Sequence, residues 1–269
     1  MHPGPLRDGL TLVAGLATGA LSAAFGVGGA VVSTPAIRAL GASATLAIGT
    51  TLPSILPSAV TGTVRYVRER LILWHVVYWT VPAGIAASVG GSLLSRIVPG
   101  HGHWLMVLTA ALLGLTAWRM ARRPAPAPVP ATDDDVLALV AEGPPRTAPA
   151  LLIAIGAAAG LLSGLLGIGG GVIMVPAFTE LARLPLKSAI ATSLVCVGIY
   201  AVPGTVTHAA LGDIDWRFAL LLSVAVIPGA RLGAVAAIRA SDRRLRLAVA
   251  GFLGVVSIVY ATGELLALR

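Results

Sequence analysis

Apolar stretches of 16 to 24 residues alternate with short polar segments along most of the chain. A helix needs about 20 apolar residues to cross a hydrocarbon core roughly 30 Å thick. The pattern therefore predicts membrane-spanning helices, together with two apolar segments that are interrupted by runs of glycine. The predicted spans are residues 43–66, 72–95, 103–121, 187–209, 216–239 and 244–262, and the glycine-interrupted segments are residues 9–40 and 149–183.

The two glycine-interrupted segments are copies of one sequence block. Residues 15–35 align with residues 156–176 at a constant offset of 141, and later landmarks align at an offset of 142. The later pairs are Thr50-Thr51 with Thr192-Ser193, Gly62 with Gly204, and Trp74 with Trp216. An internal repeat of this kind predicts two related units joined by a connecting segment. The predicted parts are a first transmembrane repeat over residues 9–121, a polar, Pro-rich cytoplasmic linker over 122–147, and a second repeat over 148–263.

The segment after each glycine run predicts the topology of the repeat. It holds only about 11 to 13 residues, too few to cross the membrane at 1.5 Å per residue. Each half is therefore expected to be a re-entrant hairpin followed by three transmembrane helices. Three crossings per half insert the second half upside down relative to the first. The predicted fold class is an all-α polytopic membrane protein with an inverted-topology repeat, as in many secondary transporters.

The distribution of Arg and Lys agrees with this topology. If both hairpins are re-entrant, every basic loop falls on one side of the membrane, as the positive-inside rule requires. The basic segments are 65–70, 119–123 with Arg146, 183–187 and 239–246, whereas Arg38, Arg96 and Arg217 lie in the poorer loops. We therefore expect a multi-pass protein of the cytoplasmic membrane with both termini outside.

Composition excludes several classes of protein. The chain is 57% hydrophobic and 11% charged, with a mean hydropathy of +0.90, which excludes a water-soluble globule. The net charge of +8 comes from residues scattered between apolar segments, so no nucleic-acid partner is expected. Cys196 is the single cysteine, which excludes an intramolecular disulfide and a cysteine metal site. No cleaved signal peptide is expected at the start of the chain.

The glycine runs are the first candidate site. A run that opens a half-helix leaves backbone N–H groups unpaired and places about half a positive charge at that end. Entering from opposite faces, the two ends would meet near the midplane and bind an anion. The runs are Gly28-Gly29 and Gly169-Gly170-Gly171. The alternative is that glycines only permit close helix packing, which we favour for Gly15, Gly19, Gly156 and Gly160.

Paired hydroxyl residues and one arginine are further candidates. Thr50-Thr51 and Thr192-Ser193 lie at equivalent places and would coordinate an anion or a sodium ion, or bond back to their own helix carbonyls. Arg231 lies about 8 residues inside its predicted span, where a charge is costly. It would bind substrate or, alternatively, snorkel to the interface. A serine-protease dyad of Ser163 with His208 is disfavoured, and we expect no enzyme, cofactor or metal.

At these residues the sequence resembles the sulfite exporter TauE/SafE family, membrane permeases that include the 4-toluene sulfonate uptake type. The resemblance covers about residues 10–120 and 150–263 and rests on two copies of a G-x-x-x-G-x-x-S-x-x-[FL]-G-x-G-G block. The motif positions are Phe25, Gly26, Gly28 and Gly29 in the first copy, and Leu166, Gly167, Gly169, Gly170 and Gly171 in the second. Ala30 departs from the third glycine that the first copy often has. The resemblance implies transport of small sulfur oxyanions such as sulfite, sulfoacetate or other organosulfonates.

The residues and the resemblance together predict an anion transporter. Its expected partners are a small anionic substrate, the lipid bilayer and a coupling proton or sodium ion, and its oligomeric state stays open. The alternatives are a cation-coupled or cation transporter, which would use the hydroxyl pairs and unwound carbonyls, and a passive channel. Direction of transport is not encoded in the repeat, because an inverted repeat exposes its site to both sides.

Overall fold

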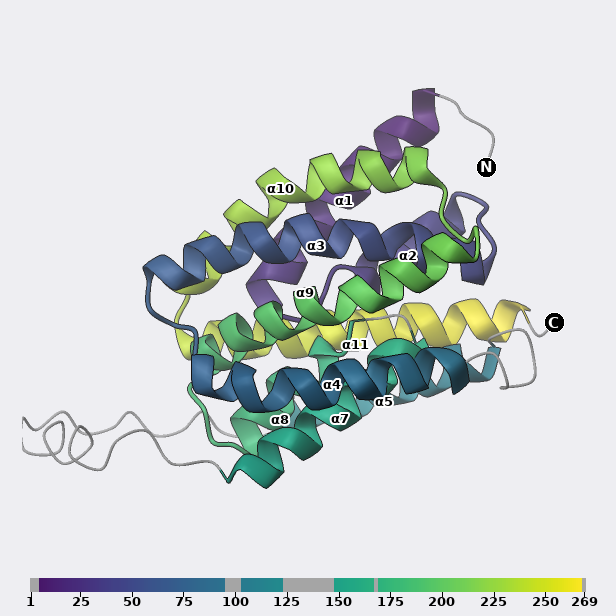
Figure 1. The fold of residues 1–269 in the computed structure, drawn as a ribbon. Coiled ribbons are helices and arrows are strands. Elements are labelled where there is room, and N and C mark those ends of the chain that lie inside the picture. Colours follow the sequence, from purple (N-terminus) through teal and green to yellow (C-terminus); the bar gives the residue numbers. More distant parts are fainter. Residues whose placement is uncertain (1–4, 95–102, 123–147, 167–168, 268–269) are drawn as a thin grey trace, which may run out of the picture.

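The computed structural model describes residues 5–94, 103–122, 148–166 and 169–267, and every regular element in those ranges is an α-helix (Figure 1). The helices of the first half are α1 (Pro5–Phe25), α2 (Ala30–Ala39), α3 (Ala44–Arg68), α4 (Trp74–Leu94) and α5 (His103–Arg122). Those of the second half are α7 (Pro149–Leu166), α8 (Gly171–Glu180), α9 (Leu186–Ala210), α10 (Trp216–Arg239) and α11 (Asp242–Ala267). The predicted linker, residues 122–147, lies outside the described residues except for Arg122.

The all-helical fold class is confirmed, and the predicted spans agree with the helices. Within the described ranges, three helices are both long and apolar enough to cross a membrane by a length-and-hydropathy criterion, namely α1, α9 and α10. The half-helices α2 and α8 have 10 residues each. At 1.5 Å per residue each is about 15 Å long, half of a hydrocarbon core. Helix α1 extends to Pro5, the first described residue, and so begins earlier than the predicted segment 9–40.

The outer surface of the helix bundle is apolar. On α10, Leu220, Val224 and Leu232 are 62%, 65% and 65% exposed. Serine and threonine side chains such as Thr18 and Ser58 are instead fully buried. In water, a folded protein does not expose a continuous apolar surface while it buries its hydroxyl groups. In a hydrocarbon solvent this arrangement is favoured. This distribution supports a multi-pass membrane protein.

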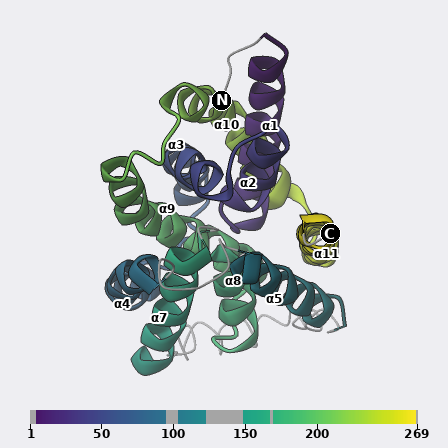
Figure 2. The same ribbon diagram turned by 90° about the vertical axis from the view of Figure 1, so that its right-hand side faces the viewer.

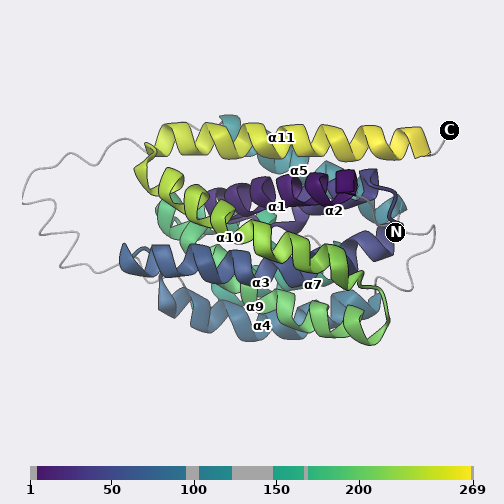
Figure 3. The same cartoon turned by 90° about the horizontal axis from the view of Figure 1, so that it is seen from above.

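The helices of the two halves are interleaved. Helix α1 packs along α10 of the other half, and the equivalent helix α7 packs along α4 (Figure 2). Helices α3 and α9 pack together in the middle, and α5 packs along α11, so that all long helices follow roughly one axis (Figure 3). The α1–α10 contact in one half-to-half pairing thus has its equivalent in the α7–α4 contact. The α3–α9 and α5–α11 contacts each join two equivalent helices.

Glycines make the α1–α10 and α7–α4 contacts close. A Cβ on Gly19 would collide with the carbonyl oxygen of Val226, and one on Gly233 with that of Ala20. On the other pair, a Cβ on Gly160 would collide with the carbonyl oxygen of Gly84. The packing role predicted for Gly15, Gly19, Gly156 and Gly160 is therefore confirmed.

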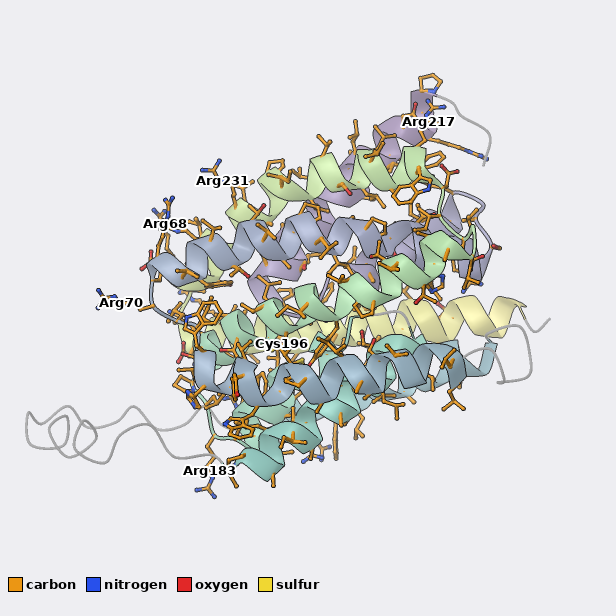
Figure 4. The ribbon with its side chains drawn as sticks, viewed as in Figure 1. Arg68, Arg70, Arg183, Cys196, Arg217 and Arg231 are labelled. Atoms are coloured by element: carbon orange, nitrogen blue, oxygen red, sulfur yellow. The ribbon has the colours of Figure 1, made fainter. Side chains whose placement is uncertain are left out.

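The ends of the bundle differ in charge. Arg68, Arg70 and Arg183 lie at the left-hand end of the view, and Arg217 lies at the right-hand end (Figure 4). Helix α1 begins at the right-hand end, where Arg217 donates a 2.6 Å hydrogen bond to Asp8. Helix α2 returns to the same end, whereas α7 begins and α8 ends at the left (Figure 1). The two broken segments thus enter the bundle from opposite ends.

Candidate functional site

The glycine runs reverse the chain between a long helix and a half-helix. Gly26 and Gly28 have φ of 65° and 89°, and Gly169 and Gly170 have φ of 85° and 67°. Residues with a Cβ rarely adopt this left-handed conformation, so glycine is required at these four positions. The reversal aims the first turns of α2 and α8 into the bundle. Gly167 and the side chain of Leu166 lie outside the described residues.

The two runs lie against each other, backbone to backbone. A Cβ on Gly169 would be 3.7 Å from the Cα of Gly28, and one on Gly171 would collide with the carbonyl oxygen of Gly26. Ile55 and Val197, which are equivalent residues of α3 and α9, flank the contact at 3.8 and 3.1 Å from the same Gly169 Cβ. The structure therefore brings together the half-helix starts singled out in the sequence, in a closed arrangement.

Ser193 and Thr51 are equivalent residues with different partners. The Ser193 hydroxyl donates a 2.8 Å hydrogen bond to the carbonyl oxygen of Gly26, inside the first glycine run. The Thr51 hydroxyl lies 3.2 Å from that of Thr34 on α2 and donates to its own helix at Ile48. Ser193 thus holds the glycine run of the other half in place, and Thr51 fastens α2 to α3.

Thr50 and Thr192 perform one task in both halves. The Thr50 hydroxyl accepts a 3.0 Å hydrogen bond from the N–H of Asp215, at the start of α10. The Thr192 hydroxyl accepts a 3.1 Å bond from the N–H of Leu73, at the start of α4. Each threonine satisfies a backbone donor at a helix start in the other half. The predicted alternatives for these residues were ion coordination and bonding within the same helix, whereas in the structure both threonines accept from a backbone N–H of another helix start.

Phe25 and Arg231 lie away from the glycine contact. The Phe25 ring packs on Phe252 of α11, with ring centroids 5.1 Å apart. Arg231 is exposed on the outer face of α10 and points away from the bundle (Figure 4). The expectation that Arg231 joins the glycine runs is therefore corrected. A helical residue two turns from the helix end can snorkel along the outer face, which is the alternative given above.

Several titratable side chains of the described residues contact one another at the ends of the bundle. His208 Nδ1 lies 3.4 Å from Asp213 Oδ2 at the end of α9, so the structure pairs this histidine with an aspartate. Glu180, at the end of α8, lies 3.1 Å from Arg119 of α5. Among the described residues, no group of three or more His, Cys, Asp or Glu side chains is placed to hold a metal ion.

Two hydroxyls beside the first glycine run were missed in the sequence. A Cβ on Gly29 would be 2.7 Å from the Thr18 methyl and 4.0 Å from the Ser22 hydroxyl oxygen. Both side chains project from α1 toward the first turn of α2. The serine belongs to the repeated motif, and the threonine aligns with Ala159 at the 141-residue offset. That difference between otherwise similar blocks was the available signal.

Known proteins similar to this chain are membrane transporters. The chain is 27% identical to "Probable membrane transporter protein YunE" of Bacillus subtilis (strain 168), over 83% of this chain and 85% of that protein. It is 27% identical to a "Probable membrane transporter protein" of Xylella fastidiosa (strain 9a5c), over 88% of this chain and 87% of that protein. It is also 23% identical to "Probable membrane transporter protein MJ0441" of Methanocaldococcus jannaschii, over 93% of each. No solved structure matches the chain significantly.

The apolar helices and these relatives define a multi-pass membrane transport protein, not an enzyme. The chain belongs to the family described as Sulfite exporter TauE/SafE, whose family model matches residues 11–260. The resemblance found in the glycine motifs is therefore confirmed. The match covers both repeats and so includes both glycine runs.

Proposed function

We propose that this protein is a secondary transporter of small sulfur-containing oxyanions, such as sulfite, sulfoacetate or another organosulfonate. The observation that carries the proposal is the contact between the starts of α2 and α8 at Gly28 and Gly169. Each helix start carries about half a positive charge and has first-turn N–H groups without intrahelical acceptors, although the Gly171 N–H of α8 donates a 2.8 Å hydrogen bond to Gly169 O. Two such ends side by side form an anion site near the membrane midplane without placing a full charge in lipid.

The chemistry of the site favours a compact anion. Backbone N–H groups and hydroxyls each donate one hydrogen bond, and a sulfur oxyanion offers several oxygens to accept them. The bundle interior has no dense cluster of Arg or Lys among the described residues, so a polyphosphate would be poorly neutralised. A small anion of charge one or two is the best match.

The proposed topology is an inverted repeat that works by alternating access. Its support is the exchange of equivalent helix contacts between the halves, and the entry of the two broken segments from opposite ends. The end with Arg68, Arg70 and Arg183 would face the cytoplasm, following the positive-inside rule. Both termini would then lie outside the cytoplasmic membrane, and residues 122–147 would be a cytoplasmic linker between repeats 9–121 and 148–263.

Uptake of labelled sulfite by proteoliposomes tests the proposal. The purified full-length chain is reconstituted, and uptake is measured with no gradient, with a proton gradient and with a sodium gradient. We expect saturable uptake that unlabelled sulfoacetate inhibits. Accumulation above equilibrium in one gradient would identify the coupling ion. Transport of sodium without any sulfur oxyanion would favour the cation alternative, and uptake that neither saturates nor accumulates would favour a passive channel.

Bulky variants at the glycine contact connect this activity to the site. Gly28→Leu and Gly169→Leu fill the space between the half-helix starts and strain two positive-φ positions, so sulfite transport should be lost. Gly251→Leu is the matched control, because Gly251 is exposed on α11 with no atom within 4 Å of a Cβ. Wild-type transport in a well-expressed Gly169→Leu protein would contradict the site assignment.

A further inference from the structure

Buried hydroxyls are unevenly divided between the two halves. Among the described residues, fifteen polar side chains are buried, and twelve of them belong to the first half. The first-half residues are Thr11, Thr18, Ser22, Ser33, Thr34, Thr50, Thr51, Ser54, Ser58, Thr80, Ser88 and Thr116, and the second-half residues are Ser163, Thr192 and Ser193. Nine of the twelve lie on α1, α2 and α3, which pack together.

The equivalent positions of the second half show that the fold does not require these hydroxyls. Four buried hydroxyl residues of the first half align with apolar or thiol side chains in the second half. The pairs are Thr18 with Ala159, Ser33 with Met174, Thr34 with Val175, and Ser54 with Cys196. Since the second half builds the same helices with these side chains, the polarity of the first half needs another explanation.

Four of the twelve first-half hydroxyls have no hydrogen-bond partner, namely those of Thr18, Ser22, Ser58 and Thr80, and the first two lie together at one helix start. Thr18 Oγ1 and Ser22 Oγ are buried without a hydrogen bond, and their side chains are 0% and 2% exposed. The Thr18 methyl group and the Ser22 hydroxyl lie beside Gly29, the residue before α2, and Gly29 has no side-chain cap. The carbonyl oxygen of Gly29 accepts from the N–H groups of Val32 and Ser33, so the N–H groups of Ala30 and Val31 are left without an intrahelical acceptor. A buried hydroxyl without a partner destabilises a fold. Retaining two at one helix start points to a partner that binds and leaves.

We infer that the transported anion is held mainly by the first repeat, at the start of α2, with the Ser22 and Thr18 hydroxyls as donors. This inference rests on the proposed function, and it means that the two repeats contribute unequally to the anion site. The Ser22 hydroxyl donates to one oxygen of the anion, and the first-turn N–H groups of α2 donate to others. Thr18, one turn earlier on α1, donates from the same side. The positive end of the helix dipole disfavours a cation at this place.

The second repeat contributes less to recognition. Ser163 is the equivalent of Ser22, but Ala159 replaces the threonine. A Cβ on Gly170 would be 2.6 Å from the carbonyl oxygen of Ala159 and 3.3 Å from the Cβ of Ser163. The serine is thus present at this turn too, but a carbonyl acceptor stands where the first repeat has the Thr18 side chain. Because a carbonyl oxygen cannot donate a hydrogen bond, this turn binds an anion less well than the turn beside Thr18. Helix α8 would close over the anion while α2 and α1 bind it.

Matched serine variants test the asymmetry. Sulfite affinity is measured by titrating sodium sulfite against the melting temperature of the purified full-length protein, with total sodium held constant by sodium chloride. Ser22→Ala and Thr18→Val remove one hydroxyl each, and Ser163→Ala is the repeat-matched control. A hydrogen bond to a charged group is worth enough to weaken binding by about tenfold or more when it is removed. We expect that loss for Ser22→Ala and Thr18→Val, and a change below about twofold for Ser163→Ala.

The ligand-free melting temperature separates a binding role from a structural one. Removing an unsatisfied hydroxyl should leave the ligand-free melting temperature unchanged or raise it, so a loss of sulfite affinity cannot come from misfolding. Equal losses in Ser22→Ala and Ser163→Ala would overturn the asymmetry. Wild-type affinity in Ser22→Ala and Thr18→Val would overturn the inference and leave the proposed function standing. Absence of any stabilisation of the wild-type protein by sulfite or sulfoacetate would overturn both.

Discussion

The contact between the glycine runs predicts the outcome of adding one methyl group. Gly171 is the first residue of α8, and its φ is not positive, so alanine is compatible with its backbone conformation. The Cβ of Gly171→Ala would lie 2.7 Å from the carbonyl carbon of Val27 and closer still to the carbonyl oxygen of Gly26. Both neighbours are backbone atoms, and Val27 is 1% exposed, so no flexible side chain can move aside.

The magnitude follows from the size of the overlap. Bringing the methyl group to van der Waals distance requires the two runs to separate by roughly 1 Å, and overpacking of this kind costs about 1–3 kcal/mol. Alanine is favoured over glycine in a helix by at most about 1 kcal/mol, which offsets part of this cost. With that offset fully realised, the expected net loss is up to about 2 kcal/mol. For a chain of this length that lowers the melting temperature by up to about 8 °C.

Gly251→Ala is the control for this measurement. Gly251 lies within α11, is exposed, and has no atom within 4 Å of a Cβ, so only the helix preference changes. Its melting temperature should stay the same or rise by a few degrees. Both proteins are compared by thermal unfolding in the same detergent. If Gly171→Ala is as stable as Gly251→Ala, the runs are not in contact and the site geometry is wrong.

Three further predictions concern particular side chains. Arg231→Gln should leave sulfite affinity within about twofold, because the guanidinium lies on the outer face, and a tenfold loss in the titration would contradict this placement. With Cys196 replaced by alanine, Ser43→Cys and Arg183→Cys should react with an impermeant thiol reagent from opposite faces of the membrane, and labelling from one face would refute the inverted topology. Thr192→Val should lower stability by about 1–3 kcal/mol in thermal unfolding, because the N–H at the start of α4 loses its acceptor, whereas Thr192→Ser should retain most of it.

The helices could be predicted from the sequence because each weak pattern occurs twice. The predicted spans 43–66 and 187–209 became α3 (44–68) and α9 (186–210), and the offset of 142 relates their landmarks. A single apolar stretch with internal prolines would have been ambiguous, as Pro53 and Pro203 both lie inside these helices. The repeat removed the ambiguity, since an element needed in one half is needed in the other.

The partners of the helices could not be predicted in this way. In lipid, small residues mark the face on which two helices approach but do not identify the second helix. Gly15 and Gly19 were correctly interpreted as packing positions, yet their partner is α10 of the other half. The same limit applies to Thr50, whose acceptor role depends on the packing of α3 against α10. A helix shows a periodic pattern of apolar residues in the sequence, but the choice of the helix that packs against it leaves no such pattern.

Candidate site residues could be predicted where the backbone conformation determines the residue type. They could not be predicted where the direction of a side chain decides whether the residue faces the site. A left-handed backbone conformation favours glycine, so the glycine runs in the sequence indicated the turns at Gly28 and Gly169. Arg231 illustrates the second case. Its depth in the span was evident, but α10 is apolar around most of its circumference, so the sequence did not reveal which face the residue occupies.

An internal repeat lets a chain serve as its own comparison, and this separates what the fold requires from what the ligand requires. Thr50 and Thr192 are the same residue in both halves, and the structure gives them the same task at equivalent helix starts. Gly28 and Gly169 likewise share a conformation that both hairpins need. Thr18 and Ala159 occupy equivalent places on equivalent helices, yet one is a buried hydroxyl without a partner. Agreement between the halves thus identifies residues that the scaffold needs in both, and the departure at Thr18, beside the unpartnered Ser22, is the difference from which we infer that the first repeat holds the anion.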